Sequence, residues 1–460
     1  MPYQTVNPHD GTTLKTFDTF TTEQLESALN AAATASPAWG TAPFATRSAV
    51  VAKAAALMRA RVDELAHLVT LEMGKRLVES RGEVQLSADI LDFYSTNAEA
   101  FLAPVTLSPK RGTAHLENAP LGILFGVQPW NFPYYQLARF AAPNIMAGNV
   151  VLVKHAASVP QCALAFERVW ADAGAPAGVY TNLFITHEQV NQVIDDVRVR
   201  GVALTGSTEA GRSVAARAGQ NLKKSTMELG GSDAFIVLED ANLDEAVRWA
   251  VWAKMNNTGQ SCVAGKRFIV VEPFAKAFLS KFIAALGSLV PGDPMKSETT
   301  LGPMSSEAAL KTLLAQVDRA VAEGARVLLG GARLDRPGAF MQPTVLAGLT
   351  PGNPLFYEEF FGPVALVFTV ADEAEAIRLA NDSPYGLGGC VFTNDVARGH
   401  RVARQLDTGM VFINHPTWTA AELPFGGTKQ SGYGRELARL GIGEFINQKL
   451  VRVDALDGAA

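Results

Sequence analysis

The residue of this chain best suited to covalent chemistry is Cys262, which ends the polar segment NTGQSC at residues 257–262. A cysteine thiolate is a strong nucleophile, and a nearby glycine lets a substrate or cofactor approach the backbone closely. Cys162 lies in an apolar helical window and Cys390 follows a pair of glycines, so both are typical of buried structural cysteines. Cys262 could also be structural, but the polarity of its loop favours a nucleophile.

A cysteine nucleophile needs an activating neighbour, and the sequence offers a glutamate more readily than a histidine. His155 follows a predicted strand and His415 precedes a proline, so neither stands in an obvious catalytic motif and a Cys–His hydrolase has no support. Glu228 stands in the segment MELGG, where paired glycines predict a turn at the mouth of a strand. Glu228 is therefore a candidate general base, although a solvated turn residue would show the same pattern.

Two further segments could hold an oxyanion and a phosphate. In PWNFP, residues 129–133, two prolines fix the backbone around Asn131, whose side-chain amide could then donate to an oxyanion, although an ordered turn explains the segment equally well. The segment TGSTEAG, residues 205–211, follows a predicted strand and opens a helix, so its backbone N–H groups could hold a phosphate. Because it is neither a GxGxxG fingerprint nor a P-loop, it indicates a nucleotide site only weakly by itself.

The composition restricts the class of protein that carries these residues. The 460 residues include 40 Lys and Arg against 45 Asp and Glu, a net charge of −5, and 48% of them are hydrophobic. These values are typical of a globular protein of roughly two or three domains, and they argue against nucleic acid or an anionic membrane as the main partner.

The first twenty residues lack an apolar signal segment, and prolines interrupt the uncharged stretch 118–138, so no membrane span is expected. Three scattered cysteines fit neither a disulfide framework nor a metal site, which predicts the cytoplasm.

Short apolar runs alternate with helical windows, which predicts parallel sheets with helices on both faces. A helical region at residues 21–99 precedes a first series with strands at 121–127, 150–153, 179–184 and 201–204 and helices at 133–147, 161–173, 188–195 and 209–218. A second series has strands at 234–238, 268–271, 326–329 and 364–368 and helices at 243–256, 275–286 and 308–322. The β-prone segments 111–117 and 450–453 belong to neither series, and such isolated strands can pair with another subunit.

Together and in this order, PWNFP, GSTEAG, MELGG and NTGQSC resemble the motifs of the aldehyde dehydrogenase superfamily. Further matches are EEFFGP at residues 358–363, NDSPYGL at 381–387 and PFGGTKQSG at 424–432, so the resemblance runs over nearly the whole chain. It implies an α/β fold with a Rossmann-like dinucleotide-binding domain, an α/β catalytic domain and a small β oligomerisation element of a homodimer or homotetramer. The expected boundaries are residues 1–100 and 121–230, residues 231–440, and residues 101–120 and 441–460, respectively.

The resemblance also implies a reaction. Cys262 would attack the aldehyde carbon, and the Asn131 amide with the Cys262 backbone N–H would hold the resulting oxyanion. Hydride would then pass to the nicotinamide, leaving a thioester that Glu228 hydrolyses by activating water; Glu228 could also help to deprotonate the thiol. These roles agree with the chemistry read from the residues, because a thiolate adds reversibly to an aldehyde and its thioester is readily hydrolysed.

For the cofactor, the resemblance implies that Lys154 binds the adenosine ribose, Ser207 contacts the pyrophosphate and Glu359 holds the nicotinamide ribose. The remaining cofactor positions that it implies are Trp130, Gly206 and Phe361. NAD-selective members carry a glutamate three residues after this lysine, where its charge repels a 2′-phosphate, whereas this chain has Ala157 beside Ser158. We therefore predict NADP or NAD as the cofactor, with NADP accepted and even preferred.

The positions that would line the substrate pocket by resemblance are polar or aromatic: Phe132, Tyr135, Gln136, Arg139, Asn256, Ser261, Thr419 and Phe425. Arg139 falls where succinate-semialdehyde dehydrogenases carry a carboxylate-binding arginine, so a short carboxylated aldehyde such as succinate semialdehyde is the expected substrate. A salt bridge from Arg139 to a neighbouring acid is the alternative. Two departures stand against the assignment, because Asn256 replaces a second arginine of some of these enzymes and Ala264 replaces their redox-switch cysteine. The compact N-terminus and the segment CVAGKRF most resemble the bacterial branch of this group.

Four other functions remain open at this point. A CoA-acylating semialdehyde dehydrogenase would lack the hydrolytic glutamate of MELGG, so Glu228 argues against it. A non-catalytic nucleotide-binding homologue is disfavoured by the presence of Cys262, Glu228 and Asn131 together. A cysteine-dependent hydrolase, or a dehydrogenase for another polar or aromatic aldehyde, would use the same residues.

Overall fold

The first half of the chain builds a six-stranded sheet whose strand order is that of a dinucleotide-binding fold. The computed structural model describes residues 3–454. Its sheet has the order β19-β9-β8-β5-β6-β7, in which β5 to β9 are parallel and β19 is antiparallel to β9. Counted along the chain from β5, this is the order 3-2-1-4-5 of a doubly wound sheet. The strands are β5 (Ile123–Gln128), β6 (Val150–His155), β7 (Tyr180–Asn182), β8 (Val199–Thr205), β9 (Lys224–Glu228) and β19 (Gly432–Tyr433).

Eight helices in this half cover and connect the sheet, close to the predicted ranges. They are α1 (Thr22–Thr41), α2 (Phe44–Ala60), α3 (Val62–Met73), α4 (Leu77–Phe101), α5 (Pro133–Met146), α6 (Pro160–Ala173), α7 (His187–Asp195) and α8 (Thr208–Gln220). The predicted helical region is broken into four helices, the third of which ends at Gly74 in the left-handed conformation (φ 77°). The predicted strands and helices of the first series are all present, with ends shifted by a few residues.

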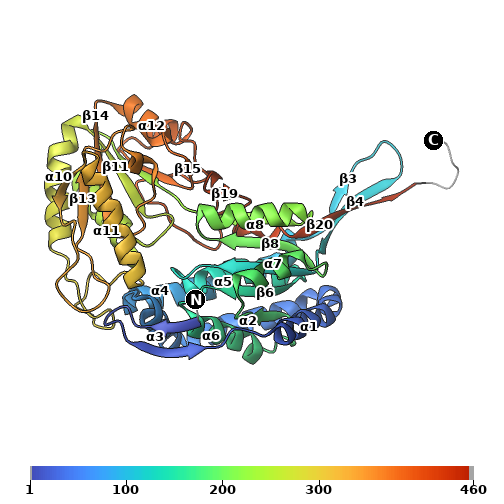
Figure 1. Cartoon of the computed structure of the whole chain (residues 1–460). Helices are drawn as coiled ribbons and strands as arrows, with labels where there is room; N and C mark the ends of the chain where they lie inside the picture. The colour runs from blue at the N-terminus through green and yellow to red at the C-terminus, as the bar shows by residue number, and fades with distance from the viewer. Residues whose placement is uncertain (1–2, 455–460) are drawn as a thin grey trace.

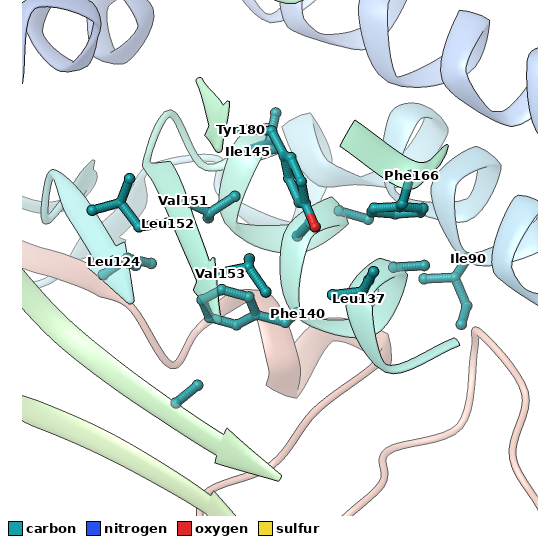
Figure 2. Packing of buried hydrophobic residues seen from close by; sticks show 14 of the residues in the cluster. Ile90, Leu124, Leu137, Phe140, Ile145, Val151, Leu152, Val153, Phe166 and Tyr180 are labelled. Carbon is teal, nitrogen blue, oxygen red and sulfur yellow. The ribbon is translucent and has the colours of Figure 1, made fainter. Parts of the chain in front are cut away.

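The core of this half lies where α5 and α6 pack on β6 (Figure 2). Figure 2 shows Val151 and Val153 of β6 facing Phe140 and Leu137 of α5. Phe166 of α6 is fully buried and touches several rings, those of Tyr134, Trp170 and Tyr180. This packing fixes α5 against the sheet, and α5 begins immediately after the Asn131 loop.

The second half builds a seven-stranded sheet with the order β12-β13-β14-β11-β10-β16-β17, parallel except for β12. Neighbouring residues of β10 face opposite sides, since Phe235 packs with α9 and α10 whereas Ile236 packs with α11, α12 and α13. Both faces are therefore covered, as predicted. The elements are β10 (Asp233–Val237), β11 (Gly265–Val271), β12 (Arg326–Leu329), β13 (Thr344–Ala347), β14 (Val364–Val370), β16 (Gly389–Phe392), β17 (Phe412–Ile413), α9 (Leu243–Met255), α10 (Glu272–Gly287), α11 (Glu307–Ala322), α12 (Glu373–Asn381) and α13 (Val396–Ala403).

A three-stranded antiparallel sheet extends from the body of the molecule as an arm (Figure 1). It consists of β3 (Val105–Leu107), β4 (Thr113–Pro120) and β20 (Ile446–Val453), with β4 in the centre. The two β-prone segments that fitted neither series are thus strands that pair with each other. Leu450 and Val453 on β20 are exposed. Residues 455–460, which we assigned to the oligomerisation element, lie outside the described residues.

The C-terminal segment returns to the first half earlier than the predicted boundary at residue 440. β19 already pairs with β9, and Tyr94 of α4 donates to the carbonyl of Ala438 in α14 (Ala438–Ile442). The short β elements between the halves, β15 (Tyr385–Gly386) and β18 (Thr428–Lys429), pair with each other. At the N-terminus, β1 (Tyr3–Val6) and β2 (Thr13–Phe17) form a hairpin that the sequence analysis did not predict. Within residues 3–454, no helix combines the length and apolar character needed to cross a bilayer.

Substituting Phe166 should destabilise the first half without touching the loops at its edge. Phe166→Ala should lower the free energy of unfolding by about 3–5 kcal/mol, because the ring is wholly buried and the neighbouring rings cannot close the cavity. Leu164→Ala on the same helix is the matched control, since Leu164 is exposed and should lose less than about 1 kcal/mol. Urea unfolding followed by tryptophan fluorescence measures both values; equal losses would contradict this account of the core.

Candidate active site

The loop that carries Cys262 has an unusual backbone. It begins with the 3₁₀ helix η1 (Asn256–Gly259), in which Asn257 (φ 52°), Thr258 (φ 54°) and Gly259 (φ 74°) are all left-handed. Each left-handed non-glycine residue costs roughly 1–2 kcal/mol, and a Cβ on Gly259 would collide with the carbonyl oxygen of Gly362. The chain therefore reverses sharply before Cys262, which is half-buried, whereas Cys162 and Cys390 are buried. The structure thus agrees with the selection of Cys262 as the accessible thiol.

Asn131 contacts this loop directly. It follows β5, is buried, and donates from its side-chain nitrogen to the carbonyl of Gln260 (3.1 Å). Asn257 in turn donates to the carbonyls of Asn131 (2.9 Å) and Gln260 (3.1 Å). A side-chain amide has two N–H donors, so Asn131 keeps one that can point at an oxyanion. The side-chain amide of Gln136 touches that of Asn131 at 2.8 Å.

A buried ion pair that the sequence analysis missed holds the Asn131 loop from the other side. Lys75, directly after α3, pairs with Glu83 of α4 and donates to the carbonyl of Asn131 (2.9 Å). Its ammonium lies 3.7 Å from the centre of the Phe132 ring. Glu83 accepts from the backbone N–H groups of Tyr134 (2.8 Å) and Tyr135 (3.2 Å), the first free donors of α5. The pair therefore fixes both the Asn131 backbone and the start of α5.

Glu228 ends β9 as a buried carboxyl group. It is 3% exposed, and neither carboxyl oxygen has a hydrogen-bond partner among the described residues. Burial, followed by the nearby Glu436, raises the pKa of Glu228 well above its ordinary value, and Arg139 opposes the rise. A carboxyl group with a raised pKa can accept a proton from water or a thiol near neutral pH. Glu228 is thus buried rather than the solvated turn residue that was the alternative.

Arg139 forms the intramolecular ion pair that was the alternative to substrate binding. Its guanidinium pairs with Glu436, a partner that the sequence analysis did not identify. Its other two nitrogens donate to hydroxyl groups, to Tyr135 (3.1 Å) and to Thr205 (3.1 Å). The guanidinium also lies 4.6 Å from the centre of the Phe425 ring. All three guanidinium nitrogens therefore have a protein neighbour.

The other predicted substrate residues divide into two groups. The hydroxyls of Tyr135 and Thr419 are bonded to each other (2.8 Å), which joins them to Arg139 in one buried polar cluster. Phe132 packs edge to face on Tyr135. Asn256 is half-buried at the end of α9, and Ser261 is buried with its backbone carbonyl bonded to Lys266 (2.6 Å). No side-chain hydrogen bond joins these last two to the Arg139 cluster among residues 3–454.

The predicted cofactor residues lie at the carboxyl edge of the first sheet and on the loop facing it. Trp130 after β5 packs edge to face on Phe361 (5.8 Å between ring centres). Glu359 accepts from the backbone N–H of Gly231 (3.1 Å), and Gly206 donates to the Glu228 carbonyl (3.0 Å). The strand order reverses at β5 and β8, and this is where doubly wound sheets bind their ligands.

The remaining cofactor positions surround the same edge. Ser207 is exposed and caps α8 by accepting from the Ala210 N–H (3.2 Å), which leaves the helix N-terminus open to an anion. Lys154, at the end of β6, is half-buried and has no hydrogen bond or ion pair among residues 3–454. Ala157 and Ser158 follow in the turn after β6, half-buried and without a carboxylate of their own.

The sequence carried few signals for the residues that were missed. Lys266 and Arg267 begin β11, which is otherwise apolar, and a pair of basic residues in a buried strand is an anomaly that could have been noted. Lys75 follows the helix-ending Gly74, a position without a functional signature. Glu436 lies far from Arg139 in sequence, so only the tertiary structure reveals that pair.

A half-buried thiol and an amide that bonds to its loop, with a buried carboxyl group at the end of a strand in a doubly wound sheet, are the groups expected of a cofactor-dependent oxidoreductase. The family model described as the aldehyde dehydrogenase family matches residues 1–451, and the chain belongs to that family. The resemblance and the fold inferred from the motifs are thereby confirmed.

Several relatives are similar over their full length. The chain is 52% identical over 451 residues to a succinate-semialdehyde dehydrogenase [NADP(+)] of Deinococcus radiodurans, covering 98% of this chain and 94% of the relative. It is 44% identical to a probable succinate-semialdehyde dehydrogenase [NADP(+)] of Synechocystis sp., covering 98% and 99%. The crystal structure of succinic semialdehyde dehydrogenase from Streptococcus pyogenes in complex with NADP+ superposes with a TM-score of 0.97 at 43% identity, covering 98% of this chain and 100% of that one.

Replacing Asn131 should separate oxyanion stabilisation from the other steps. Asn131→Ala should lower kcat by about 10²–10³-fold, the usual cost of losing one oxyanion donor. Alkylation of Cys262 by iodoacetamide forms no oxyanion, so its rate should stay within about threefold of the wild-type rate, a difference below 1 kcal/mol. Steady-state kinetics and peptide mass spectrometry give the two values. Equal losses of turnover and of alkylation would show that Asn131 only shapes the Cys262 loop.

Proposed function

We propose that this protein oxidises succinate semialdehyde, or a similar short carboxylated aldehyde, to the acid with NADP as cofactor. The observation that carries the proposal is that Asn131 bonds to the Cys262 loop while the unpartnered Glu228 carboxyl and Cys262 both interact electrostatically with Arg139, at the carboxyl edge of a doubly wound sheet. The full-length similarity to relatives named as succinate-semialdehyde dehydrogenases [NADP(+)] supports the substrate and the cofactor.

The residues present fit a dinucleotide with a 2′-phosphate. The Lys154 ammonium lies 5.7 Å from the centre of the Tyr3 ring and has no side-chain hydrogen bond or ion pair among residues 3–454, so its N–H groups can donate to ribose or phosphate oxygens. The open N-terminus of α8 suits the pyrophosphate. Position 157 is an alanine, so no carboxylate there repels a 2′-phosphate. Glu359 would hold the nicotinamide ribose, with Trp130 and Phe361 against the ring.

In the proposed mechanism, Cys262 gives up its proton to Glu228 directly or through water, and its sulfur bonds to the aldehyde carbon. The carbonyl oxygen becomes an oxyanion that accepts hydrogen bonds from the Asn131 amide and the Cys262 backbone N–H. Bound NADP+ supplies the oxidant by taking a hydride from that carbon. Glu228 would release the first proton to solvent and then remove a proton from the water that attacks the thioester carbon; the carbon–sulfur bond breaks, the acid leaves, and the thiolate sulfur takes a proton back from Glu228.

The carboxylate of the substrate would bind at the Arg139 cluster. Glu436 balances the charge of Arg139 and fixes its plane, whereas the two nitrogens that bond to Tyr135 and Thr205 face neutral hydroxyls. A substrate carboxylate can exchange with these hydroxyls, and the hydroxyls of Tyr135 and Thr419 can donate to it in turn. The proposal thus accommodates both the ion pair and the substrate.

We also propose a homodimer or homotetramer that associates through the arm of β3, β4 and β20. The exposed apolar residues Val105, Leu450 and Val453 lie on strands of this sheet, and exposed edge strands are commonly covered by another chain. All three cysteines are free, and the cytoplasm would keep the nucleophilic thiol reduced.

Glu228→Gln should leave hydride transfer and stop hydrolysis. We expect a burst of NADPH stoichiometric with active sites followed by turnover at least about 10²-fold slower, because the thioester accumulates. In the wild type, kcat should fall as the pH decreases through the raised pKa of Glu228, since protonation removes the base. Stopped-flow absorbance and a pH series of kcat measure these effects, with Cys262→Ser as the control that gives no burst. Normal turnover of Glu228→Gln would contradict the assigned role.

A substrate and cofactor panel tests the proposed function as a whole. Arg139→Leu should lower kcat/KM for succinate semialdehyde by about 10²-fold, or 2.7 kcal/mol, and for hexanal by only a few fold. Arg139→Leu leaves the buried Glu436 carboxylate without its ion-pair partner. The double variant Arg139→Leu/Glu436→Gln removes that charge and should show the same difference in kcat/KM between the two aldehydes. The wild type should use NADP at least as efficiently as NAD. Equal losses for both aldehydes, or a 10²-fold preference for NAD, would overturn the assignment.

A further inference from the structure

Lys266 occupies a position that the mechanism above does not use. It is the second residue of β11 and is fully buried. Its ammonium donates to the carbonyls of Ser261 (2.6 Å) and Cys262 (2.6 Å), and it forms an ion pair with Glu359 (3.0 Å). An ammonium has three N–H donors, so all of them are used. Arg267 points to the opposite side of the strand, where it donates to the carbonyls of Ser232, Leu379 and Ala380.

The ion pair links the nucleophile loop to the turn after Glu228. The oxygen of Glu359 that pairs with Lys266 also accepts from the backbone N–H of Gly231 (3.1 Å). A Cβ on Gly230 would collide with the second oxygen of Glu359, so this turn packs tightly on the carboxylate. One lysine therefore connects the backbone of Cys262, the turn of MELGG and the loop that carries Phe361.

Lys266 is the cation that acts most strongly on the pKa of the Cys262 thiol. Burial raises the pKa of Cys262 to about 12, Lys266 and Arg139 act to lower it, and Glu359 and Asp233 act to raise it. Arg139 is paired with Glu436 and Lys266 with Glu359, but of these two cations only Lys266 also bonds to the Cys262 backbone. Lys254 is also buried nearby, but burial lowers the pKa of its amine well below the ordinary value, which favours the neutral form.

We propose that Lys266 is a positioning residue of the proposed dehydrogenase reaction, which fixes the Cys262 backbone against Glu359 and stabilises the Cys262 thiolate with its positive charge. The proton of the thiol leaves to Glu228 or to water, and the sulfur keeps the electron pair. The ammonium of Lys266 neither gains nor loses a proton in this step. Because Glu359 is also the proposed ribose-binding residue, the same lysine joins the nucleophile to the cofactor site.

The test is the rate at which iodoacetamide alkylates Cys262 between pH 6 and pH 10 in the full-length protein without ligands. Lys266→Met should alkylate at least about tenfold more slowly than the wild type at each pH below the thiol pKa, since only the thiolate reacts. Mass spectrometry of the Cys262 peptide confirms the site. Lys254→Met is the matched control, because Lys254 is equally buried and has no hydrogen-bond partner in residues 3–454. Its alkylation rate should stay within about twofold of the wild-type rate, since a neutral amine contributes no charge.

Two further variants separate the charge from a structural role. Lys266→Arg keeps the positive charge, so its Cys262 should be alkylated faster than that of Lys266→Met. Lys266→Gln keeps hydrogen bonding but no charge, so its alkylation rate should match that of Lys266→Met. If the methionine variant fails to fold, the arginine and glutamine variants still make the comparison. In turnover, Lys266→Met should lower kcat more than it raises KM for the aldehyde. The proposal would be overturned if Lys266→Met were alkylated at the wild-type rate, or if Lys266→Arg and Lys266→Gln slowed alkylation equally. Alkylation needs neither aldehyde nor NADP, so a wrong substrate assignment would leave this result unchanged.

Discussion

The site depends on a backbone reversal that the chain would not adopt by itself. Asn257 and Thr258 are left-handed although neither is glycine, at a cost of roughly 1–2 kcal/mol each. A typical hydrogen bond returns about 1 kcal/mol, so several are needed to hold the turn. They come from both sides, because the Asn131 amide donates to the Gln260 carbonyl and the Asn257 amide donates to the Asn131 carbonyl. The geometry that presents Cys262 thus requires the first half of the chain to be folded and docked on the second.

Buried ion pairs hold the loops around Cys262 in place within each half of the chain (Figure 1). Lys75 pairs with Glu83 and Arg139 with Glu436 in the first half and the C-terminal segment that packs on it, and Lys266 pairs with Glu359 in the second half. Such pairs add little net stability, but losing one partner leaves the other charge buried and unpaired at a cost of several kcal/mol. A wrong arrangement of these loops would leave the charges unpaired in the same way. The pairs therefore act mainly against wrong arrangements of the loops.

The sequence predicted the parts of this structure that depend on local pattern. The alternation of apolar runs and helical windows was enough for most elements of both sheets, and the motifs around Cys262, Asn131 and Glu228 were enough for the candidate catalytic groups. The hairpin β1–β2 was missed because both strands are short and neither contains an apolar run. Glu436 and Lys75 were missed because their importance comes from partners that only the tertiary structure supplies. The salt-bridge partner of Arg139 could not be named from the sequence, because Glu436 lies far from it along the chain.

The electrostatics of the resting site explain why these partners matter. Burial raises the pKa of both Cys262 and Glu228, so it disfavours the charged form of the nucleophile as well as that of the base. Forming the thiolate then requires that its proton leave and that a fixed positive charge remain close to the sulfur. Arg139 and Lys266 are each paired with a carboxylate, but of the two only Lys266 bonds to the backbone of Ser261 and Cys262, so its ammonium is the cation fixed to the nucleophile loop.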